Sequence, residues 1–260
     1  MNYLVKRGLL AMACSIGVGL SQSSVAAPDT ATATIDWSNL QLLVTGVGDT
    51  TPTATFSGQF TSLNSNASSS GLSESNSKSV NNWTATAETN ADAGITSANA
   101  LASPLSFSGN ANAENGFANS DGGRTVNFSL DGPGVLTVSV PYTISLTGDP
   151  FDGNCCFSFD QASVSGFANF SSLTGNASSN SNASFSLNSF SSLSPQSQSG
   201  TLLFGIFASD AGSGSLGVNF NLSTQDGVNP IPEPESYAML LAGLGLMGAV
   251  VRRRRMNRNA

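Results

Sequence analysis

The sequence predicts an all-β fold, an antiparallel β-sandwich of jelly-roll type with Ser/Asn-rich loops. Apolar and polar side chains alternate over residues 135–146, a period of two that is typical of a strand with one buried face. Shorter alternating runs bounded by Gly- and Ser-rich turns recur at intervals of roughly 8 to 15 residues. Between the two ends of the chain, no apolar period of 3.6 residues extends over a useful length. A β-solenoid is the second possibility, although no fixed repeat length supports it.

The first third of the body alternates weakly. A strand is expected from Ile35, and its apolar phase reverses near Asn39, which favours a bulge or a bend at that point. A second strand is expected over residues 56–60. Residues 64–78 are almost all Ser, Asn and Gly, a composition typical of a long surface loop or a flexible excursion. A further strand is expected over residues 80–87, followed by short strands and loops.

The central third gives the clearest pattern. Residues 126–130 alternate and are expected to form a hairpin with residues 135–146, because Asp, Gly and Pro at positions 131–134 are turn residues. Pro141 lacks a backbone donor, which indicates an edge position or a bulge in the second of these strands.

The last third continues in the same way. Apolar residues alternate over residues 164–170, and a short strand is expected around Phe185 after a Ser/Asn-rich stretch. Residues 202–208 and 216–222 are expected to pair as a final hairpin.

The N-terminus has the pattern of a secretory signal peptide over residues 1–26. Lys6 and Arg7 precede an apolar run over residues 8–20, and small residues follow at positions 24–27. Cleavage after Ala26 fits this pattern, and cleavage after Ala27 fits it as well. The body of the mature protein is therefore expected to comprise residues 27–229.

The C-terminal segment, residues 230–260, has three parts in a fixed order. Prolines at positions 230, 232 and 234 make an extended, accessible spacer. Residues 237–251 carry no charge and predict a helix about 22 Å long, short for a membrane core of about 30 Å. Basic residues over 252–258 are expected to stay on the cytoplasmic side. The apolar side chains expected in the membrane are Tyr237, Leu240, Leu241, Leu244, Leu246, Val250 and Val251, and the basic stop is Arg252, Arg253, Arg254 and Arg255.

This segment resembles the PEP-CTERM sorting signal of bacterial envelope proteins. The matching features are Pro232-Glu233-Pro234, the Leu/Gly/Ala-rich run and the terminal arginine cluster. The resemblance implies recognition and cleavage by exosortase, a membrane-embedded protease, with release or transfer of the body to the cell surface or medium. It also implies a link to exopolysaccharide and biofilm. A plain membrane anchor that is never processed is the alternative.

Charge is sparse in the body and mostly negative. Lys78 and Arg124 are its only basic residues against 14 acidic ones, a net charge of about −12. Nucleic acid is excluded as a partner, because its phosphates require basic groups. Solubility must come from Ser, Thr, Asn and Gly, and such surfaces suit an extracellular medium.

Catalytic and metal-binding groups are few. The chain has no histidine, so Ser-His-Asp and Cys-His catalysis are excluded. A glycosidase needs two carboxylates, for which Asp149, Asp152 and Asp160 are the best grouped, although most acids here stand at turns. Asp149, Asp152 and Asn154 are weak calcium ligands by type, without EF-hand spacing. No cofactor is expected, and we expect no enzyme.

Cysteine and tryptophan leave alternatives open. Cys155 and Cys156 are adjacent, so they form a strained vicinal disulfide, remain thiols, or bridge to other chains. Trp37 and Trp83 are expected to be buried, with sugar-stacking platforms as the alternative.

These observations favour two alternative functions. The first is a non-enzymatic structural protein of the envelope or extracellular matrix. The second is a carbohydrate-binding, lectin-like module, with or without calcium.

Overall fold

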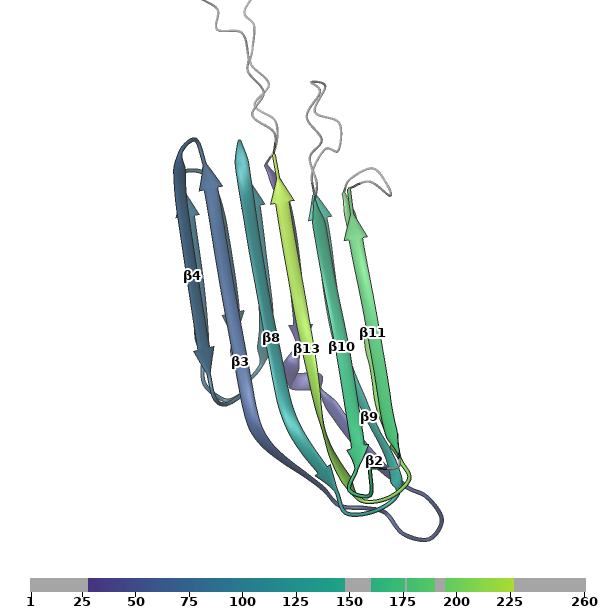
Figure 1. The fold of residues 1–260 in the computed structure, drawn as a ribbon. Coiled ribbons are helices and arrows are strands. Elements are labelled where there is room, and N and C mark those ends of the chain that lie inside the picture. The colour runs from purple at the N-terminus through teal and green to yellow at the C-terminus, as the bar shows by residue number, and fades with distance from the viewer. Residues whose placement is uncertain (1–27, 148–159, 176, 190–194, 227–260) are drawn as a thin grey trace, which may run out of the picture.

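The computed structural model describes residues 28–147, 160–175, 177–189 and 195–226. Over these residues the chain forms 13 strands, and its only helical element is the single 3-10 turn η1, Trp37–Asn39. The strands build two antiparallel sheets that pack face to face (Figure 1). The predicted all-β antiparallel sandwich is therefore confirmed.

The first sheet has seven strands and the second has six. The seven-stranded sheet has the order β12-β9-β1-β7-β6-β5, and β2 pairs with β9 as well. Its strands are β1 (Asp29–Asp36), β2 (Gln41–Gly46), β5 (Ala87–Ala93), β6 (Thr96–Ala102), β7 (Ser106–Ala113), β9 (Gly134–Thr147) and β12 (Gln196–Ala208). The six-stranded sheet has the order β11-β10-β13-β8-β3-β4. Its strands are β3 (Ala54–Ser69), β4 (Leu72–Val80), β8 (Gly116–Leu130), β10 (Gln161–Ser172), β11 (Ser178–Asn188) and β13 (Gly212–Gln225).

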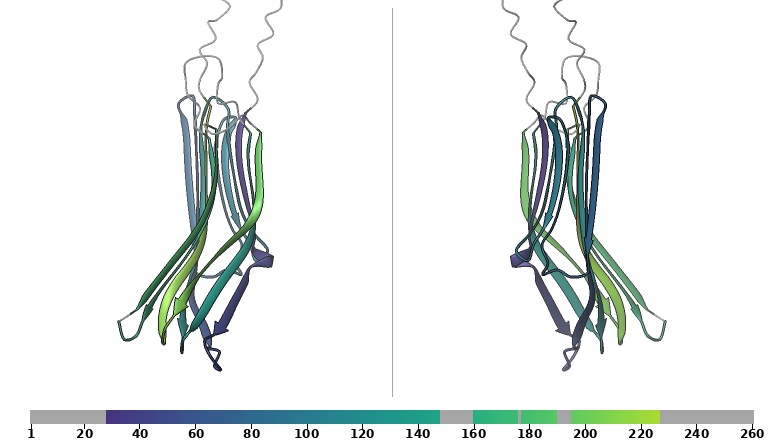
Figure 2. Two further views of the ribbon diagram at one scale, coloured as in Figure 1. Left: turned by 90° about the vertical axis from the view of Figure 1, so that its right-hand side faces the viewer. Right: turned by 90° about the vertical axis from the view of Figure 1, so that its left-hand side faces the viewer.

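The jelly-roll type is not confirmed. The pairs β3–β4 and β10–β11 are hairpins within one sheet, and β5, β6 and β7 form a meander within the other. A jelly roll is instead an arrangement of eight strands in two Greek keys. Figure 2 shows the two sheets running close together over most of their length and diverging toward one end.

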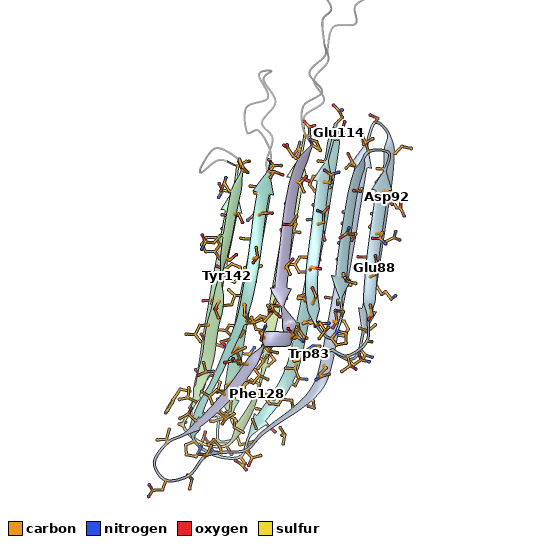
Figure 3. The ribbon with its side chains drawn as sticks, turned by 180° about the vertical axis from the view of Figure 1, so that it is seen from behind. Trp83, Glu88, Asp92, Glu114, Phe128 and Tyr142 are labelled. Atoms are coloured by element: carbon orange, nitrogen blue, oxygen red, sulfur yellow. The ribbon has the colours of Figure 1, made fainter. Side chains whose placement is uncertain are left out.

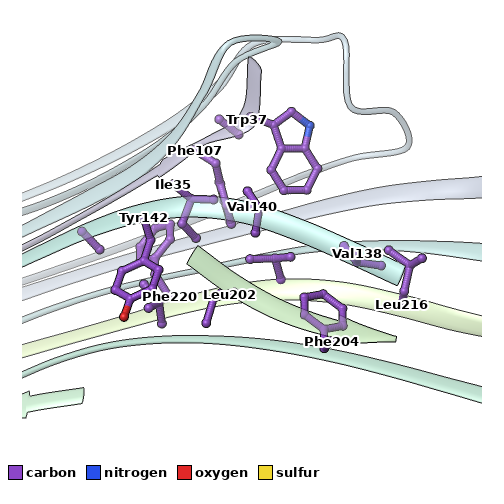
Figure 4. Packing of buried hydrophobic residues seen from close by; sticks show 14 of the residues in the cluster. Ile35, Trp37, Phe107, Val138, Val140, Tyr142, Leu202, Phe204, Leu216 and Phe220 are labelled. Atoms are coloured by element: carbon purple, nitrogen blue, oxygen red, sulfur yellow. The ribbon is translucent and has the colours of Figure 1, made fainter. Parts of the chain in front are cut away.

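The alternating segments supply the core. All six apolar residues of the predicted inner face of β9 are buried: Leu136, Val138, Val140, Tyr142, Ile144 and Leu146. The inner faces predicted for β12 and β13 are buried as well. Figure 4 shows Phe204, Leu202 and Phe220 lying among the residues of this cluster.

Glycine opposite an aromatic ring recurs in the core. A Cβ atom at Gly166 of β10 would lie 2.6 Å from Cδ1 of Phe204 in the other sheet. One at Gly122 would lie 2.6 Å from Cε1 of Phe220. The small residue leaves the space that the ring fills, so these glycines set the distance between backbone and ring.

Two predicted hairpins are wrong. β8 and β9 are joined by the predicted turn at Asp131, but β8 lies in the six-stranded sheet and β9 in the seven-stranded sheet. β12 and β13 are divided between the sheets in the same way. A turn of this composition can reverse the chain within one sheet or carry it from one sheet to the other. Here the connection between sheets is favoured, because it lets the apolar faces of the two strands pack against each other.

The predicted bend near Asn39 is confirmed. β1 pairs with β9 as far as Ile35–Tyr142, η1 follows, and β2 resumes the pairing with β9 at Gln41–Ser139. Pro141 of β9 lies at this interruption. β9 is not an edge strand, because β12 pairs along its other side. A residue without an N–H thus occupies the position where β9 loses its neighbour on one side.

The Ser/Asn-rich loop predicted over residues 64–78 is wrong, since these residues form most of the β3–β4 hairpin. β11 is likewise longer than predicted. By contrast, residues 81–86, which were expected to lie within a strand, contain none. Composition misleads here because β4 and β11 are edge strands, where polar side chains replace apolar ones.

Side chains of these edge strands bond to the edge of the opposite sheet. The N–H of Asp92 in β5 donates to Oε2 of Glu74 in β4 at 3.0 Å, and Asn76 Nδ2 donates to the carbonyl of Asn90. Figure 3 shows Asp92 on this edge strand. On the opposite side, the N–H of Gly205 in β12 donates to Oγ of Ser181 in β11 at 3.4 Å. Both sides of the sandwich are therefore bridged by side-chain hydrogen bonds.

Candidate functional site

The end of the sandwich where the described chain finishes carries two aspartates. Asp160 precedes β10, and Asp226 follows β13. Oδ1 of Asp160 accepts a hydrogen bond from the N–H of Gln225 at 3.1 Å. Oδ2 of Asp226 accepts from the N–H of Asn115 at 3.1 Å. The two carboxyl groups thus hold the last residues of β13 against the neighbouring strand β10 and the turn before β8.

Asp160 is the more unusual of the two. Its side chain is fully buried, and its Oδ2 has no hydrogen-bond partner within the described ranges. Burial raises its pKa to about 6, and the nearby charge of Asp226 acts in the same direction, while the Gln225 hydrogen bond opposes both. Asp160 therefore changes protonation state near pH 6, close to the point where the chain leaves the body.

Sequence reasoning grouped Asp160 with Asp149 and Asp152, and the latter two lie outside the described residues. The carboxyl group that the structure places near Asp160 is Asp226. The sequence holds a signal for it, because the buried alternation of β13 through Leu222 continues to Thr224 and Asp226.

A second polar cluster is buried in the middle of the sandwich. The side chain of Arg124 in β8 is fully buried, and its Nη2 donates to the carbonyl of Ser103 at 2.9 Å. Its guanidinium carbon lies 4.6 Å from the ring centre of Trp37 and 5.2 Å from that of Phe107. Burial lowers the pKa of Arg124 to about 10, which still leaves it charged at neutral pH. The aromatic faces offset part of the cost of burying this cation.

Trp37 and Trp83 belong to the same cluster. Their rings meet edge to face with centres 5.0 Å apart, and both side chains are buried. Figure 3 shows Trp83 beside the η1 turn that carries Trp37. Burial is confirmed for both, and the alternative of sugar-stacking platforms is wrong. The ring of Trp37 instead covers Arg124, and its contact with Trp83 holds η1 against the segment between β4 and β5.

Many predicted site residues lie outside the described residues. These are the sorting motif Pro232, Glu233 and Pro234, the predicted membrane helix over residues 237–251, the arginines from 252 to 255, the cysteines Cys155 and Cys156, and the calcium candidates Asp149, Asp152 and Asn154. Across the ranges that are described, no three His, Cys, Asp or Glu side chains are grouped to hold a metal ion. Those ranges also contain no helix of the length and hydropathy that a membrane crossing requires.

Comparison with known families decides the nature of the C-terminal segment. The family model of the PEP-CTERM protein-sorting motif matches residues 230–255. The chain carries a PEP-CTERM sorting motif. No curated protein and no solved structure gives a match.

The PEP-CTERM motif supports an exported protein that is sorted by exosortase. It implies a membrane-anchored precursor and then a surface or extracellular product. The match begins at residue 230, four residues after Asp226 in the sequence.

Proposed function

We propose that the body is a non-enzymatic structural component of the cell surface or extracellular matrix, linked to exopolysaccharide or biofilm. The observation that carries this proposal is the PEP-CTERM motif directly after a β-sandwich. In this role exosortase removes the C-terminal segment, and the body then acts as a passive, durable element outside the membrane.

Two features of the body support a durable role. The edges of the two sheets are bridged by side chains such as Glu74 and Ser181, which bond to edge N–H groups of the opposite sheet. Open edges of this kind otherwise pair with other chains. The surface is rich in Ser, Thr and Asn, so its hydration depends little on ionic strength.

Mass spectrometry of the terminal peptides tests the sorted fate. The protein is recovered from the envelope and the medium of its own host. We expect a C-terminus close to Pro232–Pro234, without the apolar run and the arginines. An intact arginine tail in the membrane fraction, with no shortened form elsewhere, would make the segment a simple anchor and refute the proposal.

A matched pair of variants isolates the motif. Replacing Pro232, Glu233 and Pro234 by alanine should retain the full-length chain in the membrane fraction. Pro195→Ala, at an exposed proline of the body, should leave processing unchanged. Equal processing of both variants would show that these three residues do not direct cleavage.

A carbohydrate-binding module is the second candidate, and the rows of hydroxyl and amide side chains on the outer face of the six-stranded sheet favour it. Calcium assistance through Asp149, Asp152 and Asn154 is a separate part of this candidate. Binding to a glycan array that is lost in a chelator would support it.

A further inference from the structure

Short polar side chains make up most of the outer face of the six-stranded sheet. Strand register aligns them in rows that cross all six strands. One row reads Ser186, Ser163, Asn221, Asp121, Asn64 and Ser77, and the next reads Asn188, Gln161, Ser223, Asn119, Asn66 and Ser75. Each row spans about 24 Å at the usual spacing of strands.

This face is almost without charge although the body is strongly acidic. Asp121 is its only charged residue within the described strands, and Oδ1 of Asp121 accepts a hydrogen bond from Asn64 Nδ2 at 3.1 Å. The acidic and basic residues of β4, Glu74 and Lys78, stand on the other side of that strand, opposite the buried Ala67 and Leu63. Partners that bind through charge find little to pair with here.

Aromatic rings interrupt the polar rows at a few positions. Phe167 of β10 covers Gly217 of β13, because a Cβ atom at Gly217 would lie 2.6 Å from its Cε1. Phe60 of β3 stands in the same row and is 39 % exposed, and Phe117 of β8 is 38 % exposed. Phe167 and Phe60 are three strands apart, about 14 Å. Such rings offer apolar faces between hydrogen-bonding groups.

We infer that this face binds a neutral polysaccharide. Hydroxyl and amide side chains both donate and accept, which matches the hydroxyls of a sugar chain, and the rings match its apolar C–H faces. An anionic polymer is disfavoured by the net charge of the body, about −12. A second copy of this chain is disfavoured as well, because the core of a protein interface is usually apolar and this face is not. The inference deepens the proposed extracellular role.

Affinity electrophoresis of the full chain in detergent tests the inference. Dextran, xylan and mannan are cast into native gels as neutral glycans, with alginate as an anionic one. We expect at least one neutral glycan to retard the protein and alginate not to do so. Absence of retardation by every neutral glycan, or equal retardation by alginate, would overturn the inference.

Variants locate the binding on this face. Phe60→Ser with Phe117→Ser should weaken binding at least fivefold. Ser165→Glu, which adds a charge in the middle of the face without removing an aromatic ring, should do the same in a chain that keeps its thermal unfolding midpoint. Phe207→Ser is the matched control, because Phe207 is an exposed aromatic residue of β12 in the other sheet.

These measurements distinguish failure of the proposed binding surface from failure of the proposed function. If binding is unchanged in the first two variants, or falls equally in Phe207→Ser, the face is not the binding surface. Sedimentation showing self-association that Ser165→Glu abolishes would assign the face to a second copy and overturn the inference. C-terminal processing is measured separately by mass spectrometry, so failure of binding with normal processing leaves the proposed function standing.

Discussion

The guanidinium carbon of Arg124 lies 4.6 Å from the ring centre of Trp37, inside a sandwich whose described residues offer this cation no carboxylate at salt-bridge distance. A buried charge without a counter-ion is costly, so the aromatic faces and the carbonyl of Ser103 must supply what a carboxylate would. The side chain also fills a large volume between the sheets.

Arg124→Ala should lower the free energy of unfolding by about 2–4 kcal/mol, because it leaves a cavity beneath Trp37 and Phe107. Arg124→Met keeps most of the volume and removes the cost of burying a charge, so it should lower it by about 1 kcal/mol or less. Urea denaturation measures both. If Met is as harmful as Ala, the hydrogen bond and the cation–ring contacts outweigh volume.

The protonation of Asp160 should make stability depend on pH. The pKa is about 6 in the folded state and near 3.8 in the unfolded state, so the folded state binds the proton more tightly. The stabilisation is complete below pH 3.8 and is lost as pH rises through 6. From pH 7 to pH 4.5 this group should raise the free energy of unfolding by about 2 kcal/mol.

Unfolding curves at several pH values check the sign. Asp160→Asn should flatten the dependence between pH 4.5 and 7, since it removes the titrating group. Asp49→Asn, in an exposed turn between β2 and β3, is the control and should leave the dependence unchanged. A stability that falls on acidification in wild type and in Asp160→Asn alike would contradict the assignment.

The bridge from Glu74 to the N–H of Asp92 should protect the edge of β5. Glu74→Ala should speed amide hydrogen exchange at Asp92 and cost about 1 kcal/mol, the usual net worth of one hydrogen bond. Ser75→Ala, one residue further and on the outer face, should leave that exchange rate unchanged. Unaltered exchange at Asp92 in Glu74→Ala would mean that the edge is protected by other groups.

Gly166→Ala should lower the free energy of unfolding by about 1–3 kcal/mol, because its Cβ would overlap the ring of Phe204. Phe204→Leu reduces the ring and should recover part of this loss in the double variant. A double-mutant cycle measures the coupling. Simple additivity would show that the two residues do not share one space.

The buried face of each strand was predictable from the sequence, but which of the two sheets the strand joins was not. The alternation in β9 identified its buried residues because every second side chain of a strand faces the same way. The same alternation does not say which sheet receives the next strand, so β8–β9 was expected as a hairpin. A turn such as Asp131–Pro133 fits both connections, and only burial of the two faces against each other distinguishes them.

Edge strands were missed for a related reason. Residues 64–78 and 178–184 look like loops because Ser and Asn dominate them. In β4 and β11 this polarity reflects two solvated or bridging faces rather than absence of a strand. In residues 64–69 of β3 the buried positions hold small residues instead: Ser65, Ala67 and Ser69. Among the buried polar groups, Asp226 continues the alternation of β13 and was accessible to that argument. Arg124 stands in the inward phase of β8 with Val126 and Phe128, so the same argument applies to it.

The positions of the first and last strands determine how far the body extends from its point of attachment. Asp29 begins β1 opposite Ala113, and Gln225 ends β13 opposite Phe117, so the first and last strands begin and end at the same extremity (Figure 1). β8, with 15 residues, spans roughly 50 Å to the other extremity. A body anchored through the residues that follow Asp226 is therefore anchored at one extremity. The Val47–Thr50 turn lies at the opposite extremity, and the two broad faces of the sandwich lie between them.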